Sequence, residues 1–286
     1  MLAQIRKNTV VSSLIIFAIL ILVHGFEAIV LRMDETVFGE NFINKLFGIG
    51  VLFIVLRGLN LKWTDIGFAK TGITKNIGLG LLIAICSFVI SYSAEILIMK
   101  GNGHSVRFGV FTTGFSLTGD AVMHTGIGFI LLCIFFNVIN VVMEEGTFRG
   151  LFFYIIGTDH SPRYAMLFQA FLFGVWHIVT PLHNLIDGDI NIGAFVALGI
   201  GYIILAGMMG IKWELLYRMT GSLYTGMADH FFNNCIATNL LHVISENGTD
   251  EMMIVRVAIA QLLSFVVVSL VWKKWYSSLT CRDLII

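Results

Sequence analysis

Charge is scarce in this sequence. Only 13% of its 286 residues are Asp, Glu, Lys or Arg, whereas 57% are hydrophobic and the mean hydropathy is +0.87. A soluble domain is normally about 45–50% apolar, so this composition excludes an ordinary soluble protein and predicts an integral membrane protein. The formal net charge is zero, with 18 basic and 18 acidic residues, so nothing indicates nucleic acid as a partner.

Several familiar motifs are also missing. The chain has no HExxH zinc-protease motif, no GxSxG serine nucleophile and no GxGD of the intramembrane aspartyl type. Its cysteines form no CxxC pair and mostly fall in apolar runs, so we interpret them as packing residues that leave the redox compartment undecided. They are Cys86, Cys133, Cys235 and Cys281. No repeat, linker or low-complexity segment divides the chain, which predicts one integral membrane domain over residues 1–286.

Long apolar runs predict the topology. A transmembrane helix needs about 20 residues to cross about 30 Å of hydrocarbon. The first run is too long for a secretory signal, and no cleavage site follows it. Pro162 is expected to begin the fifth span and Pro181 to end it, while the long fourth span is expected to kink or end near Gly146 or Gly150. The result is an all-α polytopic bundle of about eight spans, at residues 10–31, 42–59, 76–100, 121–157, 163–180, 190–213, 221–245 and 253–276.

Basic residues predict how the spans are oriented, because cytoplasmic loops carry an excess of Lys and Arg. Twelve basic residues fall on the side of the termini and five on the opposite side, whose loops are acidic. We therefore expect cytoplasmic N and C termini and a multi-pass protein of the cell membrane. The twelve are Arg6, Lys7, Arg57, Lys62, Lys70, Lys75, Arg163, Lys212, Arg218, Lys273, Lys274 and Arg282, and the five are Arg32, Lys45, Lys100, Arg107 and Arg256.

Three polar clusters interrupt the apolar runs. An ionisable group at the bilayer centre costs at least about 2.5–3.5 kcal/mol, so such groups usually face the bundle interior and mark function. Counted from the predicted cytoplasmic ends, Glu144, His177 and His230 lie at similar depths of about 20, 21 and 18 Å. Each cluster also holds a pair four residues apart, which shares one helix face. The clusters are Glu144, Glu145 and Arg149; Phe173 and His177; and His230 and Asn234, with Asn137 and Asn140 extending the first.

Each cluster also has a structural interpretation. Glu145 and Arg149 can form a neutralising ion pair, which leaves Glu144 without a charged partner. A lone membrane histidine or asparagine is more often an interhelical hydrogen bonder, although two histidines at matching depth beside a free carboxylate reverse that preference. Phe173 is expected to pack, and Asp229 is either a second acid or a bonded neighbour. We interpret the remaining polar residues as structural: His24, Glu27, Glu95, His124 and His242 near span ends, and His104, His160 and His183 in loops.

The clustered groups permit hydrolysis. A buried carboxylate near an imidazole can take a proton from water. An imidazole N–H and a carboxamide N–H on one helix face can donate to the oxyanion that forms when this water attacks an amide. A zinc site of Glu144, His177 and His230 is equally compatible with these residue types. The spacing alone does not choose between bare water and a metal.

The clusters also carry a family resemblance. They read EExxxR, FxxxH and HxxxN, with 33 residues from Glu144 to His177 and 53 from His177 to His230. In this order, and in apolar helices, they resemble the CAAX-processing and bacteriocin-processing (CPBP or Abi) intramembrane proteases, which include the type II CAAX prenyl endopeptidases. The resemblance covers residues 121–245, the expected catalytic core, and more weakly the stretch WTDIGF at 63–68.

The resemblance implies a role for each motif residue. Glu144 and His177 would activate the water, and His230 and Asn234 would stabilise the oxyanion. Glu145 and Arg149 would support the site together with Phe173, and we favour a site without metal. The implied substrate is a membrane-associated peptide or protein, such as a prenylated CAAX-type, bacteriocin or pheromone-like precursor, met in the lipid bilayer.

Two other functions stay open at this point. One is a non-catalytic membrane protein that binds a peptide, for instance in immunity to a bacteriocin. The other is an ion-coupled or proton-coupled carrier, which lacks a visible inverted repeat here. The sequence does not determine the oligomeric state.

Overall fold

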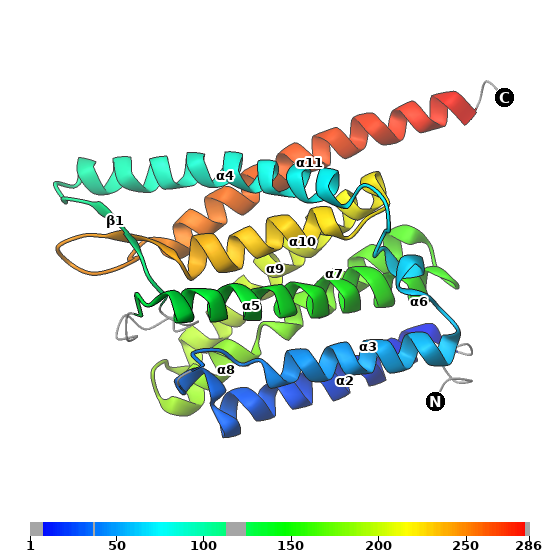
Figure 1. Ribbon diagram of the computed structural model, residues 1–286, viewed down its shortest axis with the longest axis horizontal. Helices are drawn as coiled ribbons and strands as arrows, with labels where there is room; N and C mark the ends of the chain where they lie inside the picture. Colours follow the sequence, from blue (N-terminus) through cyan, green and yellow to red (C-terminus); the bar gives the residue numbers. More distant parts are fainter. Residues whose placement is uncertain (1–7, 37, 113–123, 284–286) are drawn as a thin grey trace.

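The chain forms a bundle of long helices, with the start of α2 and the end of α11 at the same end (Figure 1). The computed structural model describes residues 8–36, 38–112 and 124–283. Arg6, Lys7, the predicted start of the fourth span at 121, and the side chains of Cys281 and Arg282 lie outside the described part.

The helical elements follow one another through most of the chain. The α-helices are α2 (Thr9–Phe26), α3 (Ile43–Leu59), α4 (Ile73–Gly101), α5 (Ile127–Glu144), α6 (Phe153–Gly157), α7 (Pro162–Trp176), α8 (Val179–Asp187), α9 (Ile192–Thr220), α10 (Tyr224–Phe231) and α11 (Met253–Asp283). Shorter 3-10 and π segments are η1 (Glu27–Leu31), η2 (Met33–Glu35), η3 (Trp63–Ile66), η4 (Glu145–Phe152) and η5 (Phe232–Thr238), and the two strands are β1 (Arg107–Val110) and β2 (Leu241–Ile244).

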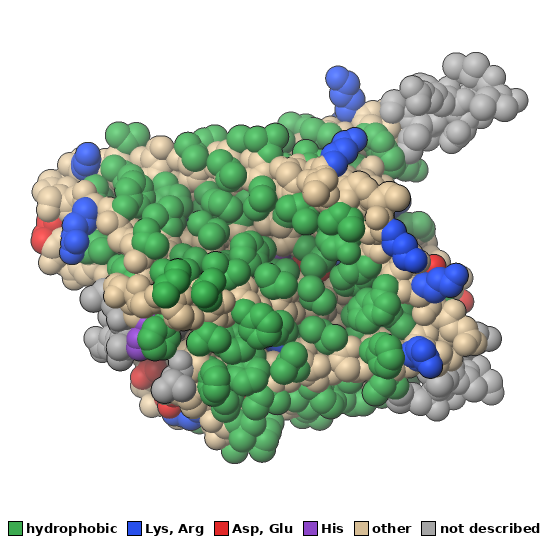
Figure 2. Space-filling view, in the orientation of Figure 1, with side chains coloured by type: hydrophobic (Ala, Val, Ile, Leu, Met, Phe, Trp, Pro, Cys, Tyr) green, Lys and Arg blue, Asp and Glu red, His purple; other side chains and the backbone are tan. Residues whose placement is uncertain are grey.

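The helices have the length and surface of membrane spans, which confirms the all-α membrane bundle. Six helical stretches in the described residues are long and apolar enough to cross a bilayer. Large exposed hydrophobic side chains cover the sides of the bundle (Figure 2). The helix α3 has 17 residues, and α10 with η5 is also short, so a total of eight spans remains a prediction. The six are Thr9–Glu35, Ile73–Gly101, Ile127–Gly157, Pro162–Asp187, Ile192–Thr220 and Met253–Ser277.

The predicted end of the fifth span is wrong. The helix α7 stops at Trp176, and Pro181 lies inside the next helix, α8. Proline has no N–H, and its ring clashes with the carbonyl four residues earlier, which here belongs to His177. The break therefore falls at His177 and Ile178, whose amides bond the carbonyls of Gly174 and Val175 at 3.2 and 3.1 Å. The proline acts one turn upstream of its own position and leaves His177 at a helix end.

The seventh predicted span, 221–245, is also too long. Its helix ends at Thr238, and the chain continues as β2, which pairs antiparallel with β1 from Arg107 opposite Ile244 to Val110 opposite Leu241. The buried Arg256 of α11 donates to the Ala237 carbonyl at 3.0 Å and so satisfies the backbone where the helix ends.

The irregularity expected in the fourth span is a π-helical segment. It begins directly after Glu144, and all eight residues of η4 are buried. A Cβ added at Gly150 would lie 2.9 Å from the Ile66 carbonyl oxygen, so glycine allows η3 to approach this segment closely. π segments inside α-helices frequently mark functional sites, and here two of them, η4 and η5, carry motif residues.

Three basic residues that we counted at the ends of the predicted spans are in fact buried: Lys45, Lys212 and Arg256. Without them, the twelve basic residues on the terminal side become eleven, and the five on the other side become three. The bias toward the end that carries the termini therefore becomes stronger, and Lys and Arg side chains gather at that end in Figure 2. The cytoplasmic location of the termini remains a prediction.

Candidate active site

Glu144 is the centre of the candidate site. It ends α5 and is 4% exposed. Its Oε1 accepts a hydrogen bond of 3.0 Å from Trp176 Nε1, and its Oε2 lies 3.5 Å from His230 Nε2. Within the described residues Oε2 accepts no hydrogen bond. The carboxylate is thus held by one oxygen and presents the other as a free acceptor.

His177 lies at the helix break and presents one free nitrogen. Its Nδ1 is 2.8 Å from the Phe173 carbonyl oxygen. Because a carbonyl only accepts, Nδ1 must carry the hydrogen, which makes Nε2 of the neutral ring an acceptor. The Phe173 ring packs edge-on against the imidazole at 4.6 Å and fixes its plane.

A buried lysine begins a chain of directed hydrogen bonds toward the site. Lys212 on α9 is 0% exposed and donates to Asp229 Oδ2, to Gln261 Oε1 at 2.6 Å and to Ser264 Oγ at 3.1 Å. Because lysine only donates, Gln261 must turn its oxygen toward Lys212 and its amide nitrogen toward Asn233 Oδ1, 2.9 Å away. The lysine therefore fixes which way the Gln261 amide points.

The orientation of the Gln261 amide in turn fixes the orientation of the next two side-chain amides, which lead to the site. Asn233 Nδ2 donates to Asn234 Oδ1 at 2.7 Å, so Asn234 turns its nitrogen to His230 Nε2 at 3.1 Å. His230 must then carry its hydrogen on Nδ1, which is 2.9 Å from Glu145 Oε1. We call Lys212, Gln261, Asn233, Asn234 and His230 the amide relay. It leads from a buried cation to a buried carboxylate and leaves the second Asn234 N–H without an acceptor among the residues that the structure describes.

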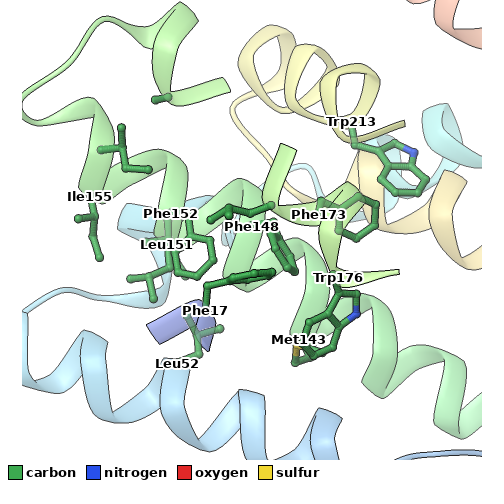
Figure 3. Close-up of a cluster of buried hydrophobic side chains, with 14 of the residues drawn as sticks. Phe17, Leu52, Met143, Phe148, Leu151, Phe152, Ile155, Phe173, Trp176 and Trp213 are labelled. Atoms are coloured by element: carbon green, nitrogen blue, oxygen red, sulfur yellow. The ribbon is translucent and has the colours of Figure 1, made fainter. Parts of the chain in front are cut away.

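Aromatic rings pack against the charged pair behind the site; Phe173 and Trp213 belong to the buried apolar cluster that Figure 3 shows. The guanidinium carbon of Arg149 is 3.8 Å from the Phe173 ring centre and 4.9 Å from that of Trp213. The expected ion pair with Glu145 is a contact of 3.5 Å between Nε and Oε2, not a hydrogen bond. Trp213 also stacks on the His230 ring at 4.0 Å. Phe173 therefore does more than fill space, because it binds the cation through its π face.

A cavity of about 350 Å³ joins the predicted residues. Glu144, His177 and Asn234 line it, and His230 touches Glu144 and Asn234 from behind. The structure thus brings Glu144, His230 and Asn234 into direct contact and places His177 on the same cavity. Asn140 lines it too, whereas Asn137 bonds the Cys133 carbonyl.

The proposed zinc ligands fit a metal poorly. Among the described residues, the three-residue group whose ligand atoms all lie within 4.8 Å of one another is Glu35, His183 and Asp187, not the triad of Glu144, His177 and His230. Ligands of a tetrahedral zinc each lie about 2.0–2.3 Å from the metal, which needs a tighter cluster than the triad provides. At the other group, Arg32 already contacts both Glu35 and Asp187.

Several contributing residues were not predicted. Trp176 is indistinguishable from a packing aromatic in an apolar helix, and Lys212 was counted only as a basic charge at the end of the predicted span 190–213. His183 was assigned to a loop but lies in α8, 3.1 Å from Asp187, and His24 stacks on Trp176 at 4.2 Å. Both histidines line the cavity. The available signal was a lysine inside an apolar run and a tryptophan beside the motif histidine.

The alternatives for Asp229 are now decided by its contacts. It accepts hydrogen bonds from Lys212 and from Trp213 Nε1, the latter at 2.6 Å, and it does not line the cavity. It is a bonded neighbour that holds the stacking ring beneath His230.

Comparison with known proteins agrees with the geometry. Residues 126–236 match the family described as type II CAAX prenyl endopeptidase, Rce1-like. This segment runs from the start of α5 into η5 and contains all three motifs. No curated protein matches the chain.

Proposed function

We propose that this chain, which belongs to the CPBP family of CAAX-processing proteases, is an intramembrane endopeptidase acting on a membrane-associated peptide or protein. One observation carries the proposal: Glu144, whose Oε2 accepts no hydrogen bond from the described residues, lines one cavity inside the bundle together with His177 and Asn234. Residues 121–245 would form the catalytic core, and the cell membrane would be its location.

Glu144 and His177 would hold the attacking water. Both residues line the cavity and carry an acceptor without a donor among the described residues, so one water between them would donate one hydrogen to Glu144 Oε2 and the other to His177 Nε2, leaving an oxygen lone pair for the peptide carbonyl. As the bond forms, Glu144 takes the first proton. It returns this proton to the amine nitrogen when the carbon–nitrogen bond breaks, so the carboxylate is restored.

Asn234 would stabilise the oxyanion. Asn234 lines the cavity with one N–H outside the relay, and the amide relay fixes its orientation before substrate arrives, which favours catalysis by preorganised donors. His230 differs from what the resemblance implies, because its Nε2 accepts from Asn234 and can donate only after gaining a proton. We assign it to positioning Asn234. Glu145, Arg149 and Phe173 would support the site, and no step requires a metal.

The test is cleavage by purified protein in lipid nanodiscs. Prenylated CAAX peptides and a panel of lipidated or membrane-anchored peptides are incubated with wild type and with Glu144→Gln. We expect wild-type cleavage that persists with chelator and falls at least a thousandfold in the variant, while the thermal unfolding temperature is kept. Cleavage that survives Glu144→Gln, or stops on chelation, would contradict the mechanism.

A further inference from the structure

The cavity leads away from Glu144 toward the end of the bundle opposite the termini. Its outer lining includes Asp34 and Glu35 of η2, and Asp187 and Asp189 at and beyond the end of α8. Figure 1 places α8 at the end far from the start of α2. Glu35, Asp187 and Asp189 are exposed, so this is where the cavity reaches the surface. We call these four carboxylates the mouth.

The mouth carries excess negative charge. Four carboxylates face a single guanidinium, that of Arg32, which contacts Glu35 and Asp187. With His183 counted as neutral, three negative charges remain. The nearby Lys45 forms an ion pair with Glu40, whose carboxylate compensates its charge. This pair therefore adds no positive charge that could neutralise the mouth.

Residues that line the same cavity carry buried acceptors without donors. Asn44 is 1% exposed, and its Oδ1 accepts no hydrogen bond from the described residues, nor do Asp34 Oδ1 and Asn41 Oδ1. Glu144 Oε2 continues this row at the inner end. A buried acceptor left unsatisfied costs about 1–3 kcal/mol, so an occupant whose N–H donors come within reach of this row is favoured. Lysine and arginine side chains provide such donors together with a positive charge.

The distance from mouth to site sets the spacing. One residue separates His177 from the start of α8, and Asp187 is the last residue of this helix. The nine residues of α8, at about 1.5 Å each, therefore place His177 and Asp187 roughly 14 Å apart. An extended peptide covers about 3.3 Å per residue. About four substrate residues therefore span from the cleaved bond to the mouth.

We propose that the enzyme selects peptides with a lysine or arginine about four residues from the cleaved bond, held by the mouth. This inference rests on the proposed function. The substrate enters from the face opposite the termini, with its cationic side chain at Asp34 and Asp189 and its scissile amide at Glu144.

A randomised library tests the spacing. Palmitoylated 12-residue peptides of mixed sequence are digested in nanodiscs, and the fragments are sequenced by mass spectrometry. We expect Lys and Arg to be enriched about four residues from the cut on one side. A fragment set without such enrichment would overturn the proposal even though the protease works.

Removing carboxylates from the mouth tests whether their negative charge causes the preference for lysine and arginine. Asp34→Asn with Asp189→Asn is chosen because neither carboxylate has an ion-pair partner among the described residues. For a matched peptide pair with lysine or norleucine at the selected position, we expect the lysine preference in kcat/KM to fall about three- to tenfold. The control Glu251→Gln removes an exposed carboxylate outside the cavity lining and should leave the preference unchanged.

Binding separates this proposal from the proteolytic one. The lysine and norleucine peptides are titrated onto the Glu144→Gln protein, where no cleavage is needed. We expect the lysine peptide to bind more tightly, and this advantage to weaken at high salt and in the double variant. That result supports recognition of a cationic side chain by the mouth, whatever the result for catalysis. Equal binding of the two peptides would refute recognition of a cationic side chain by the mouth, and it would leave the proposed function untouched.

Discussion

Trp176 is the residue that orients the candidate base. Its Nε1–H is the donor to Glu144 Oε1, and a hydrogen bond to a charged group contributes about 1.5–3 kcal/mol. Since about 1.4 kcal/mol is a factor of ten, we expect Trp176→Phe to lower kcat roughly ten- to a hundredfold. Trp272→Phe is the matched control, because Trp272 stacks on Trp275 away from the site. Equal kcat in the two variants would contradict a positioning role for Trp176.

Residues of the site differ in how visible they were in the sequence. Glu144, His177 and His230 stood out because an ionisable group in an apolar run has a high free-energy cost. Trp176 did not, since its hydrogen bond depends on a neighbouring helix. Lys212 was hidden for a related reason: its charge is compensated by Asp229, which a one-dimensional count of loop charges does not register.

The helix α11 acts on the site through one side chain. Gln261 passes the direction of the Lys212 hydrogen bond to Asn233, so Gln261→Leu should free the Asn234 amide to rotate. We expect kcat to fall about tenfold with KM nearly unchanged, because an oxyanion donor acts in the transition state. Ser264→Ala removes another Lys212 contact without interrupting the relay and serves as control. A rise in KM alone for Gln261→Leu would point to general loosening instead.

The contact between α4 and α10 predicts opposite effects for two glycines of one helix. A Cβ at Gly80 would lie 2.2 Å from the Thr225 carbonyl oxygen, whereas a Cβ at Gly78 meets nothing within 4 Å. Gly80→Ala must push α10 away and should cost about 1–3 kcal/mol, while Gly78→Ala should stabilise the helix by roughly 0.5–1 kcal/mol. Thermal unfolding in detergent measures both. A higher Tm for Gly80→Ala would show that the helices are not in close contact.

At the scale of elements, the existence of helices was predictable and their irregularities were only partly so. Apolar length alone indicated the long helices. The break at His177 follows from Pro181, but only if the proline is read as acting on the carbonyl four residues earlier. The end of η5 at Thr238 depends on Arg256 and on pairing between β1 and β2, segments more than a hundred residues apart, and no local pattern signals it.

The whole molecule has two chemically distinct ends. Among the described residues, the end with the start of α2 and the end of α11 carries eight of the eleven basic residues on the terminal side; the other end carries the mouth and most exposed carboxylates. Buried charges such as Lys45 and Arg256 had diluted this contrast in the sequence, because a buried ion pair says nothing about the side of the membrane. The face from which substrate enters is therefore coupled to the orientation of the bundle.

Orientation is tested by labelling single cysteines in a variant that lacks the native ones. Asp189→Cys lies at the mouth, and Lys62→Cys lies between α3 and η3 at the end that carries the termini. The excess of basic residues predicts that this second end is cytoplasmic. In intact cells a membrane-impermeant maleimide should label Asp189→Cys, and it should reach Lys62→Cys only after permeabilisation. The reverse pattern would place the mouth in the cytoplasm, and the enzyme would then draw its cationic substrates from the inner face.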